Sequence, residues 1–253
     1  LLSRRQRQMC IRDRLYSVAV PATSGYQTML KNIGSIENQG YELSIESDNL
    51  TGAFSWTTAF NIAFNRNKVL ELGGEEYKEM AEGDGHLKTG SVRRLIVGEP
   101  IGVFYGYRFD GIFQNEEECK QQTSSASPIG VGLRRYKDLN GDGKVDAAND
   151  REILGDANPK FFGGLTNTFA YKGFELNVFL QYSYGNKILN YNAMELENPT
   201  GGQNAYADMV NRWTPENPSN IYPKATTNRA LLVSDRFIED GSYLKLKTLS
   251  PVS

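Results

Sequence analysis

Strict alternation of apolar and polar residues over two stretches restricts this chain more than any other feature. In FSWTTAFNIAFN, residues 54–65, one face of an extended chain would carry Phe54, Trp56, Thr58, Phe60, Ile62 and Phe64. In FELNVFLQYSYG, residues 174–185, the matching positions are Phe174, Leu176, Val178, Leu180, Tyr182 and Tyr184. The opposite faces are small or polar, apart from Phe179. A period of two residues over this length predicts β-strands.

Two kinds of antiparallel sheet produce this pattern. A strand of a membrane β-barrel places one face on lipid and the other on water, with aromatic residues at the interfaces. A strand of a soluble sandwich packs the same apolar face on a core. On the two strands alone both interpretations stay open. They differ in one respect, because a barrel leaves the apolar side chains exposed to lipid and a sandwich buries them under a second sheet.

The lengths of the connections favour the barrel. YELSIES, residues 41–47, reaches the strand at Phe54 through the short DNLTGA, and LTNTFAY reaches the strand at Phe174 through KG. Long excursions, about residues 71–160 and 187–241, leave from the other ends of these strands. Short turns at one end and long loops at the other are typical of outer-membrane barrels. We therefore expect both excursions, including the strand-like residues 101–113, on the extracellular side.

Composition narrows the class of protein. The 253 residues include 39% apolar, 23% charged and 11% aromatic residues, and no apolar run approaches the roughly 18 residues of a spanning helix. The first 14 residues, LLSRRQRQMCIRDR, resemble a translated sequencing-adapter tail, so we expect them to be non-native and residues 15–253 to hold the fold. The tail carries +4 and the rest of the chain −6, which leaves no basic patch for nucleic acid. Cys119, the one cysteine outside the tail, supports neither a disulfide framework nor a metal site.

The stretch DLNGDGKVDAAND, residues 138–150, has the spacing of a calcium-binding loop. In the pattern D-x-[DN]-x-[DN]-G, oxygens at alternate positions converge on a hard cation and the glycine permits the turn. The candidate ligands are Asp138, Asn140, Asp142, the Lys144 carbonyl, Asp146 and Asp150. Asp150 is one position later than the usual last ligand. The alternative is a cluster of Asx turns without an ion.

Aromatic residues of the last excursion are candidates for substrate contact. Tyr206, Trp213 and Tyr222 could stack on a sugar or a peptide, and the alternative is packing within the loop. A catalytic site is not expected, because His86 is the one histidine and sits in a glycine-rich stretch without a partner motif. No G-x-S-x-G, H-E-x-x-H or phosphate-binding loop occurs.

Seven segments in order carry a resemblance to a known family. They are NIGSIENQGYELSI, FSWTTAFNIAFNRNKVLELGG, VGEPIGVFYGYRFDGIF, YKDLNGDGKVD, NPKFFGGLTNTFAYKGFELNVFLQYSYGNKI, RWTPENPSN and SDRFIEDGSYLKLK. Together they resemble the C-terminal part of the β-barrel in SusC/RagA-type TonB-linked outer-membrane transporters. The resemblance covers nearly everything from Leu15 to about Thr248, and the end LSPVS departs from the expected strand.

The resemblance implies an all-β fold of antiparallel up-and-down strands, part of a 22-stranded barrel in the outer membrane of a Gram-negative bacterium. It implies no enzymatic activity, and import of oligosaccharides or peptides with a SusD-like surface lipoprotein and energy from TonB. The plug and the TonB-contacting segment of the family are not among these residues. The competing interpretation is a secreted, calcium-stabilised β-sandwich that binds or cleaves polysaccharide.

Overall fold

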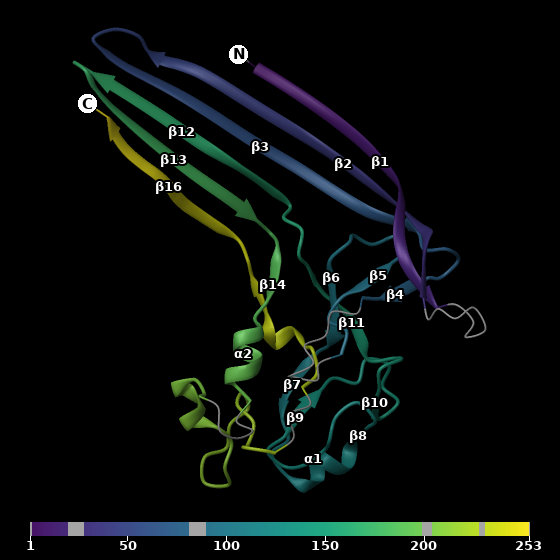
Figure 1. The fold of residues 1–253 in the computed structure, drawn as a ribbon. Coiled ribbons are helices and arrows are strands. Elements are labelled where there is room, and N and C mark those ends of the chain that lie inside the picture. Colours follow the sequence, from purple (N-terminus) through teal and green to yellow (C-terminus); the bar gives the residue numbers. More distant parts are fainter. Residues whose placement is uncertain (1, 20–27, 81–89, 199–203, 228–230, 253) are drawn as a thin grey trace.

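Six long strands form one antiparallel sheet that curves as a single layer (Figure 1). The computed structural model describes residues 2–19, 28–80, 90–198, 204–227 and 231–252. In order across the sheet, the strands are β1 (Leu2–Ala19), β2 (Thr28–Leu50), β3 (Phe54–Glu71), β12 (Phe161–Tyr171), β13 (Phe174–Tyr184) and β16 (Tyr243–Val252). Each strand pairs with its neighbour in this order, which confirms an up-and-down all-β fold.

Tight turns close one end of the sheet. Residues 51–53 join β2 to β3, and Lys172 and Gly173 join β12 to β13. Both residues of the second turn have positive φ, 49° and 88°, the backbone of a two-residue turn whose twist matches its strands. The long excursions leave from the opposite end (Figure 1), as the sequence predicts.

One face of the sheet is apolar across five strands and has no cover. The register aligns Leu43 with Ile62, Phe60 with Leu165, and Leu180 with Leu246. Phe174 is 68% exposed, Leu249 60% and Leu244 72%. Every other sheet in the described part of the chain has two strands and belongs to the excursions. These side chains are therefore not the core of a sandwich, and the barrel interpretation is the one that the structure supports.

Aromatic rings pack against two glycines of β12, one on each face of the sheet. The Tyr182 hydroxyl donates to the Asn61 carbonyl at 2.8 Å, and a Cβ on Gly163 would stand 2.6 Å from that hydroxyl and 2.1 Å from the carbonyl oxygen. A Cβ on Gly164 would stand 2.6 Å from the Phe179 ring. Phe179, the exception on the polar face, thus covers a glycine.

Polar side chains on the apolar face satisfy one another. The Asn167 side-chain oxygen accepts from the Trp56 indole at 2.9 Å and from the Thr58 hydroxyl at 2.7 Å. Pairing removes the cost of placing these groups in an apolar surrounding.

β1 contains residues that the sequence sets apart as a tail. It pairs with β2 from Leu2, opposite Ile45, to Ala19, opposite Thr28. The long edge of β2 offers backbone groups that any extended chain can pair with. The origin of the tail stays a prediction. At the other end, β16 continues through Pro251, opposite Leu176.

The excursions fold into a layer of short elements at one end of the sheet, here named the loop layer (residues 72–160 and 185–242). Its paired strands are β4 (Tyr77–Glu79) with β5 (Arg94–Ile96), β6 (Val103–Tyr107) with β11 (Arg151–Asp156), β7 (Phe109–Ile112) with β9 (Arg134–Tyr136), β8 (Thr123–Ser124) with β10 (Lys144–Val145), and β14 (Lys187–Leu189) with β15 (Ile238–Asp240). Its helices are α1 (Glu116–Gln121) and α2 (Tyr191–Leu196), with 3-10 turns at Ala207–Asn211 and Asp235–Phe237.

The main apolar core lies in the loop layer rather than on the sheet. Its largest cluster joins Phe104 and Leu154 of the first excursion to Met194, Val233 and Phe237 of the second. The two excursions are therefore one packed unit. Among the described residues, no helix has both the length and the apolar character needed to cross a membrane.

Gly163→Ala should destabilise the folded barrel, because its Cβ has no room between Tyr182 and the neighbouring strand. Overpacking of this kind costs about 1–3 kcal/mol. Gly52→Ala is the control, since the nearest atom to its Cβ, the Phe54 carbonyl oxygen, is 3.9 Å away. Heat-modifiable gel mobility of the full-length protein after a urea series reports the folded fraction. Equal urea midpoints for the two variants would contradict the tight fit at Gly163.

Candidate functional site

Aromatic side chains form two bands on the apolar face, one near each end of the strands. At the short-turn end, Phe54 and Phe169 stack with centroids 6.3 Å apart, and Trp56 and Phe169 stack at 5.8 Å. At the loop end, Phe161 lies 5.1 Å from Tyr184 and 5.9 Å from Phe64, centroid to centroid. Between the bands lie mainly aliphatic side chains such as Leu165 and Leu180, together with the Phe60 ring and the Thr58–Asn167 pair. This distribution is typical of a lipid-facing barrel wall with an aromatic girdle at each interface.

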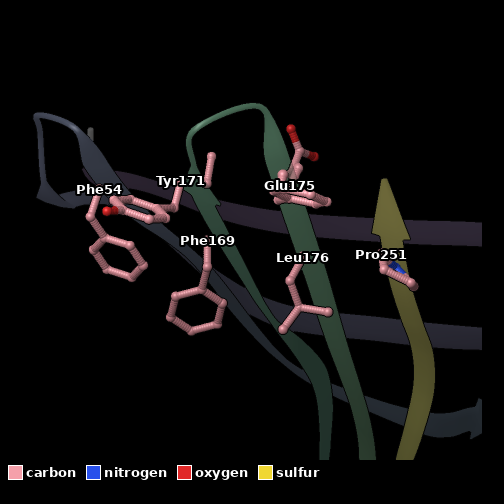
Figure 2. Close-up of a pocket in the computed structure, with 8 residues that line it drawn as sticks. Phe54, Phe169, Tyr171, Glu175, Leu176 and Pro251 are labelled. Carbon is pink, nitrogen blue, oxygen red and sulfur yellow. The ribbon is translucent and has the colours of Figure 1, made fainter. Parts of the chain in front are cut away.

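Figure 2 shows a hollow in the band at the short turns. It has a volume of about 530 Å³, and its side chains come from four strands, β3, β12, β13 and β16. The lining residues are Phe54, Phe169, Ala170, Tyr171, Phe174, Glu175, Leu176 and Pro251. An open hollow of mostly apolar side chains on this face suits an acyl chain better than a polar solute.

An ion-pair network fastens the short strands of the first excursion. The Glu79 carboxylate accepts from Arg94 and, at 2.9 Å, from Arg151. The Arg94 guanidinium lies 4.0 Å from the Tyr77 ring centroid and 3.8 Å from that of Tyr105. Partial burial by itself raises the pKa of Glu79, but the bonds and charges of the two arginines outweigh it and leave that pKa below its ordinary value of 4.5.

A second set of polar contacts joins the two excursions. Arg108 pairs with Glu152 and, at 3.2 Å, with Asp235, while the other Asp235 oxygen accepts the Phe109 N–H at 2.8 Å. Within the second excursion, Arg236 pairs with Glu197 at 2.6 Å. Asp235 and Arg236 belong to the second excursion, so the loop layer is fastened by charge as well as by its apolar core.

The calcium-like loop closes on its own backbone. Asp138 accepts from the N–H groups of Gly141 and Gly143, both at 2.7 Å. Asp142 accepts the Lys144 N–H at 2.8 Å, and its second oxygen accepts from the Asn140 amide at 2.9 Å. This is the geometry of the Asx-turn alternative.

The acidic residues at the end of the loop also bond to backbone amides. Asp146 accepts from Ala148 and Asn149 at 2.9 and 3.0 Å, and the Asn149 bond is the main cause of its lowered pKa. Asp150 is fully buried and accepts from Leu139 and Asp146 at 2.8 and 2.7 Å. No group of three acidic, histidine or cysteine side chains in the described part of the chain is placed to hold a metal. Calcium binding by the six candidate ligands stays a prediction.

The three aromatic candidates for substrate contact differ in their surroundings. The Trp213 indole donates to Gln114 at 3.1 Å, and a Cβ on Gly132 would stand 2.5 Å from the Trp213 ring. Tyr222 lies beside Trp213, whose N–H donates to the Tyr222 carbonyl at 3.0 Å. Tyr206 is 37% exposed. Trp213 and Tyr222 are half-buried, whereas Tyr206 is exposed. The role of the three side chains in substrate binding stays a prediction. His86 lies outside the described residues.

Comparison with known proteins gives relatives in sequence and in fold. The chain is 38% identical to TonB-dependent receptor P3 of Formosa agariphila over 239 residues, which are 94% of this chain and 24% of the receptor. It is 25% identical to TonB-dependent receptor SusC of Bacteroides thetaiotaomicron, over 94% of this chain and 22% of that receptor. The chain thus spans about a quarter of the length of these curated relatives. No family model matches it.

Solved structures agree on the fold. The RagAB peptide transporter matches with a TM-score of 0.72 and 22% identity, over 98% of this chain and 26% of that chain. The RagAB peptide importer in its open-open state matches with a TM-score of 0.73 and 20% identity, over 98% of this chain and 25% of that chain. At this identity the match shows the arrangement of strands and loops alone.

The lowered pKa of Glu79 predicts a pH-dependent contribution to the stability of the loop layer. A carboxylate with a depressed pKa stabilises the fold above its unfolded pKa, near 4.5, and this contribution is lost as the pH falls through the lower, folded pKa. In Glu79→Gln, protease resistance of the loop layer at pH 7 should decrease, and the loss of resistance as the pH falls below the ordinary pKa of 4.5 should be shallower. Glu75→Gln, at an exposed position, is the control. An unchanged acid profile in Glu79→Gln would contradict the role of the network.

Proposed function

Because this chain has the sequence and the fold of a segment of a SusC/RagA-type TonB-dependent receptor, we propose that its protein is an outer-membrane transporter of a Gram-negative bacterium. The observation that carries the proposal is the exposed apolar face with an aromatic band near each end. In water, an apolar surface that extends over five strands would drive aggregation. In a bilayer it is the surface that contacts lipid.

The ends of the sheet support one orientation in the membrane. Barrels of this class have short turns on the periplasmic side and long loops outside. Residues 51–53 and the Lys172–Gly173 turn would then face the periplasm, and the loop layer would lie at the cell surface. The strands β12 and β13, with 11 residues each, have the length needed to cross.

The polar face of the sheet would then line the lumen. It carries Glu42, Asn61, Thr166 and Gln181, with Lys245 on the last strand, at positions that alternate with the apolar ones. Hydrogen-bonding side chains along this wall suit a polar solute. The rest of the barrel and the plug of such a receptor would come from parts of the protein outside these 253 residues.

The substrate class that we propose is an oligosaccharide or a peptide, imported with energy from TonB. RagAB is described as a peptide transporter, and the curated relatives are named receptors rather than enzymes. A SusD-like lipoprotein is the proposed partner at the cell surface. The exposed apolar side chains Val210 and Ile221 in the loop layer, 75% and 50% accessible, are where we expect it to dock.

Transport can be tested with the full-length receptor in its host. Uptake of the cognate oligosaccharide or peptide should stop when TonB is deleted and return when it is restored.

Tyr206→Ala should weaken substrate binding by roughly 5-fold to 100-fold if its ring stacks on the substrate, in line with about 1–3 kcal/mol per stacked ring, while barrel folding stays unchanged. Trp213→Ala should instead make the loop layer sensitive to protease. TonB-independent uptake would overturn the proposed function.

Calcium binding by residues 138–150 is a separate proposal. Its support is the spacing of Asp138, Asn140, Asp142, Lys144, Asp146 and Asp150, and the ion would supply only a structural charge that draws these oxygens together. Calcium should protect the loop layer from protease, and Asp138→Asn with Asp142→Asn should remove that protection. Asp110→Asn, outside the loop, is the control. If calcium leaves proteolysis of the parent receptor unchanged, the site does not exist, and the Asx-turn interpretation holds.

A further inference from the structure

Arg134 is a buried cation with an unused hydrogen-bond donor. The residue is 8% exposed, at the start of β9, and one of its terminal nitrogens donates to the Glu197 carbonyl at 3.0 Å. Its Nε has no hydrogen-bond partner. In the described part of the chain, the Ser234 hydroxyl oxygen is the one other buried side-chain nitrogen or oxygen without a partner. A buried donor without a partner costs about 1–3 kcal/mol, and more when the group is charged.

The charges around Arg134 do not balance. Glu197 is the one carboxylate among the charged groups that act on it, and both bonds of that carboxylate go to Arg236, at 2.9 and 2.6 Å. Two guanidiniums thus share one carboxylate, and each lies 5.9 Å from the Phe237 ring centroid. Burial lowers the pKa of Arg134, but an arginine does not lose its proton in a protein. Counted over the described residues, the cluster therefore retains one uncompensated positive charge.

A small cavity adjoins this charge. Its volume is about 50 Å³, and its lining includes Arg134, the buried Asn198 and the apolar side chains of Leu133, Pro223 and Leu231. Ser234 does not line it. A drug-sized ligand needs roughly 300–1,000 Å³, so a sugar or a peptide side chain does not fit. A water-sized occupant needs roughly 10–15 Å³.

We propose that this cavity binds a small inorganic anion of the size of chloride, held by the Nε–H of Arg134. A water molecule could accept the same hydrogen bond but would leave the charge unbalanced, and an uncompensated buried charge is the more costly defect. The Asn198 side chain offers a second donor at the cavity wall. The anion would lock β9 of the first excursion against the end of α2 and Glu197 in the second.

The site can be tested on the full-length receptor in detergent, at constant ionic strength, with chloride compared to gluconate, which is too large for the cavity. Cleavage of the loop layer by protease should be about tenfold slower when chloride stands at ten times its dissociation constant. Arg134→Met should abolish the difference between the two salts while the loop layer still folds, because an apolar side chain of similar length removes the buried charge itself.

Arg135→Met is the matched control. Arg135 is the next residue and forms ion pairs with Asp110 and Glu118 at 2.9 and 3.3 Å, so its loss should weaken the loop layer equally in both salts. Crystals soaked in bromide should give an anomalous peak beside Arg134 in the parent and none in Arg134→Met. No bromide peak in the parent, or a chloride effect that persists in Arg134→Met, would overturn the proposal. None of these measurements depends on transport, so they stand apart from the proposed function.

Discussion

The two-residue period of the strands is the constraint on which the rest of the structure depends. It places the large apolar side chains of five neighbouring strands on one face, apart from Phe162 and Phe179, and the register keeps Phe60 beside Leu165 and Leu180 beside Leu246. A slip of one residue would put Asn61 and Gln181 on lipid. The hydrogen-bonded ladder also pairs the backbone groups, which no solvent could satisfy inside a bilayer. The sheet is thus a wall with a lipid side and a water side.

The loop layer follows a different principle, because it is held by contacts between distant parts of the chain. Phe109 and Asp235 are 126 residues apart, and Arg134 and Glu197 are 63 apart. Its largest apolar cluster and the Arg108–Asp235 ion pair both join the two excursions. A surface built in this way can present residues such as Tyr206 to a solute or a partner while its base stays anchored to the strands.

Acidic and basic groups within the loop layer show why spacing alone is a weak guide to a site. The D-x-N-x-D-G pattern predicts converging ligands, yet the carboxylates of Asp138 and Asp142 are taken up by nearby backbone N–H groups. Asp150, one position later than the usual last ligand, is buried and accepts from the N–H groups of Leu139 and Asp146. Arg134, by contrast, belongs to no motif. Its unbalanced charge arises from packing.

The sequence by itself determined the strands, their faces, the end with short turns and the end with long excursions, because a two-residue period and turn residues act over a few positions. It also indicated the family, through ordered segments along nearly the whole chain. Only the tertiary structure decided that the apolar face has no second sheet over it, that Phe179 covers Gly164, and that Trp213 packs while Tyr206 stays exposed. These outcomes depend on contacts between residues far apart in the chain, and no local pattern records which distant surfaces will meet.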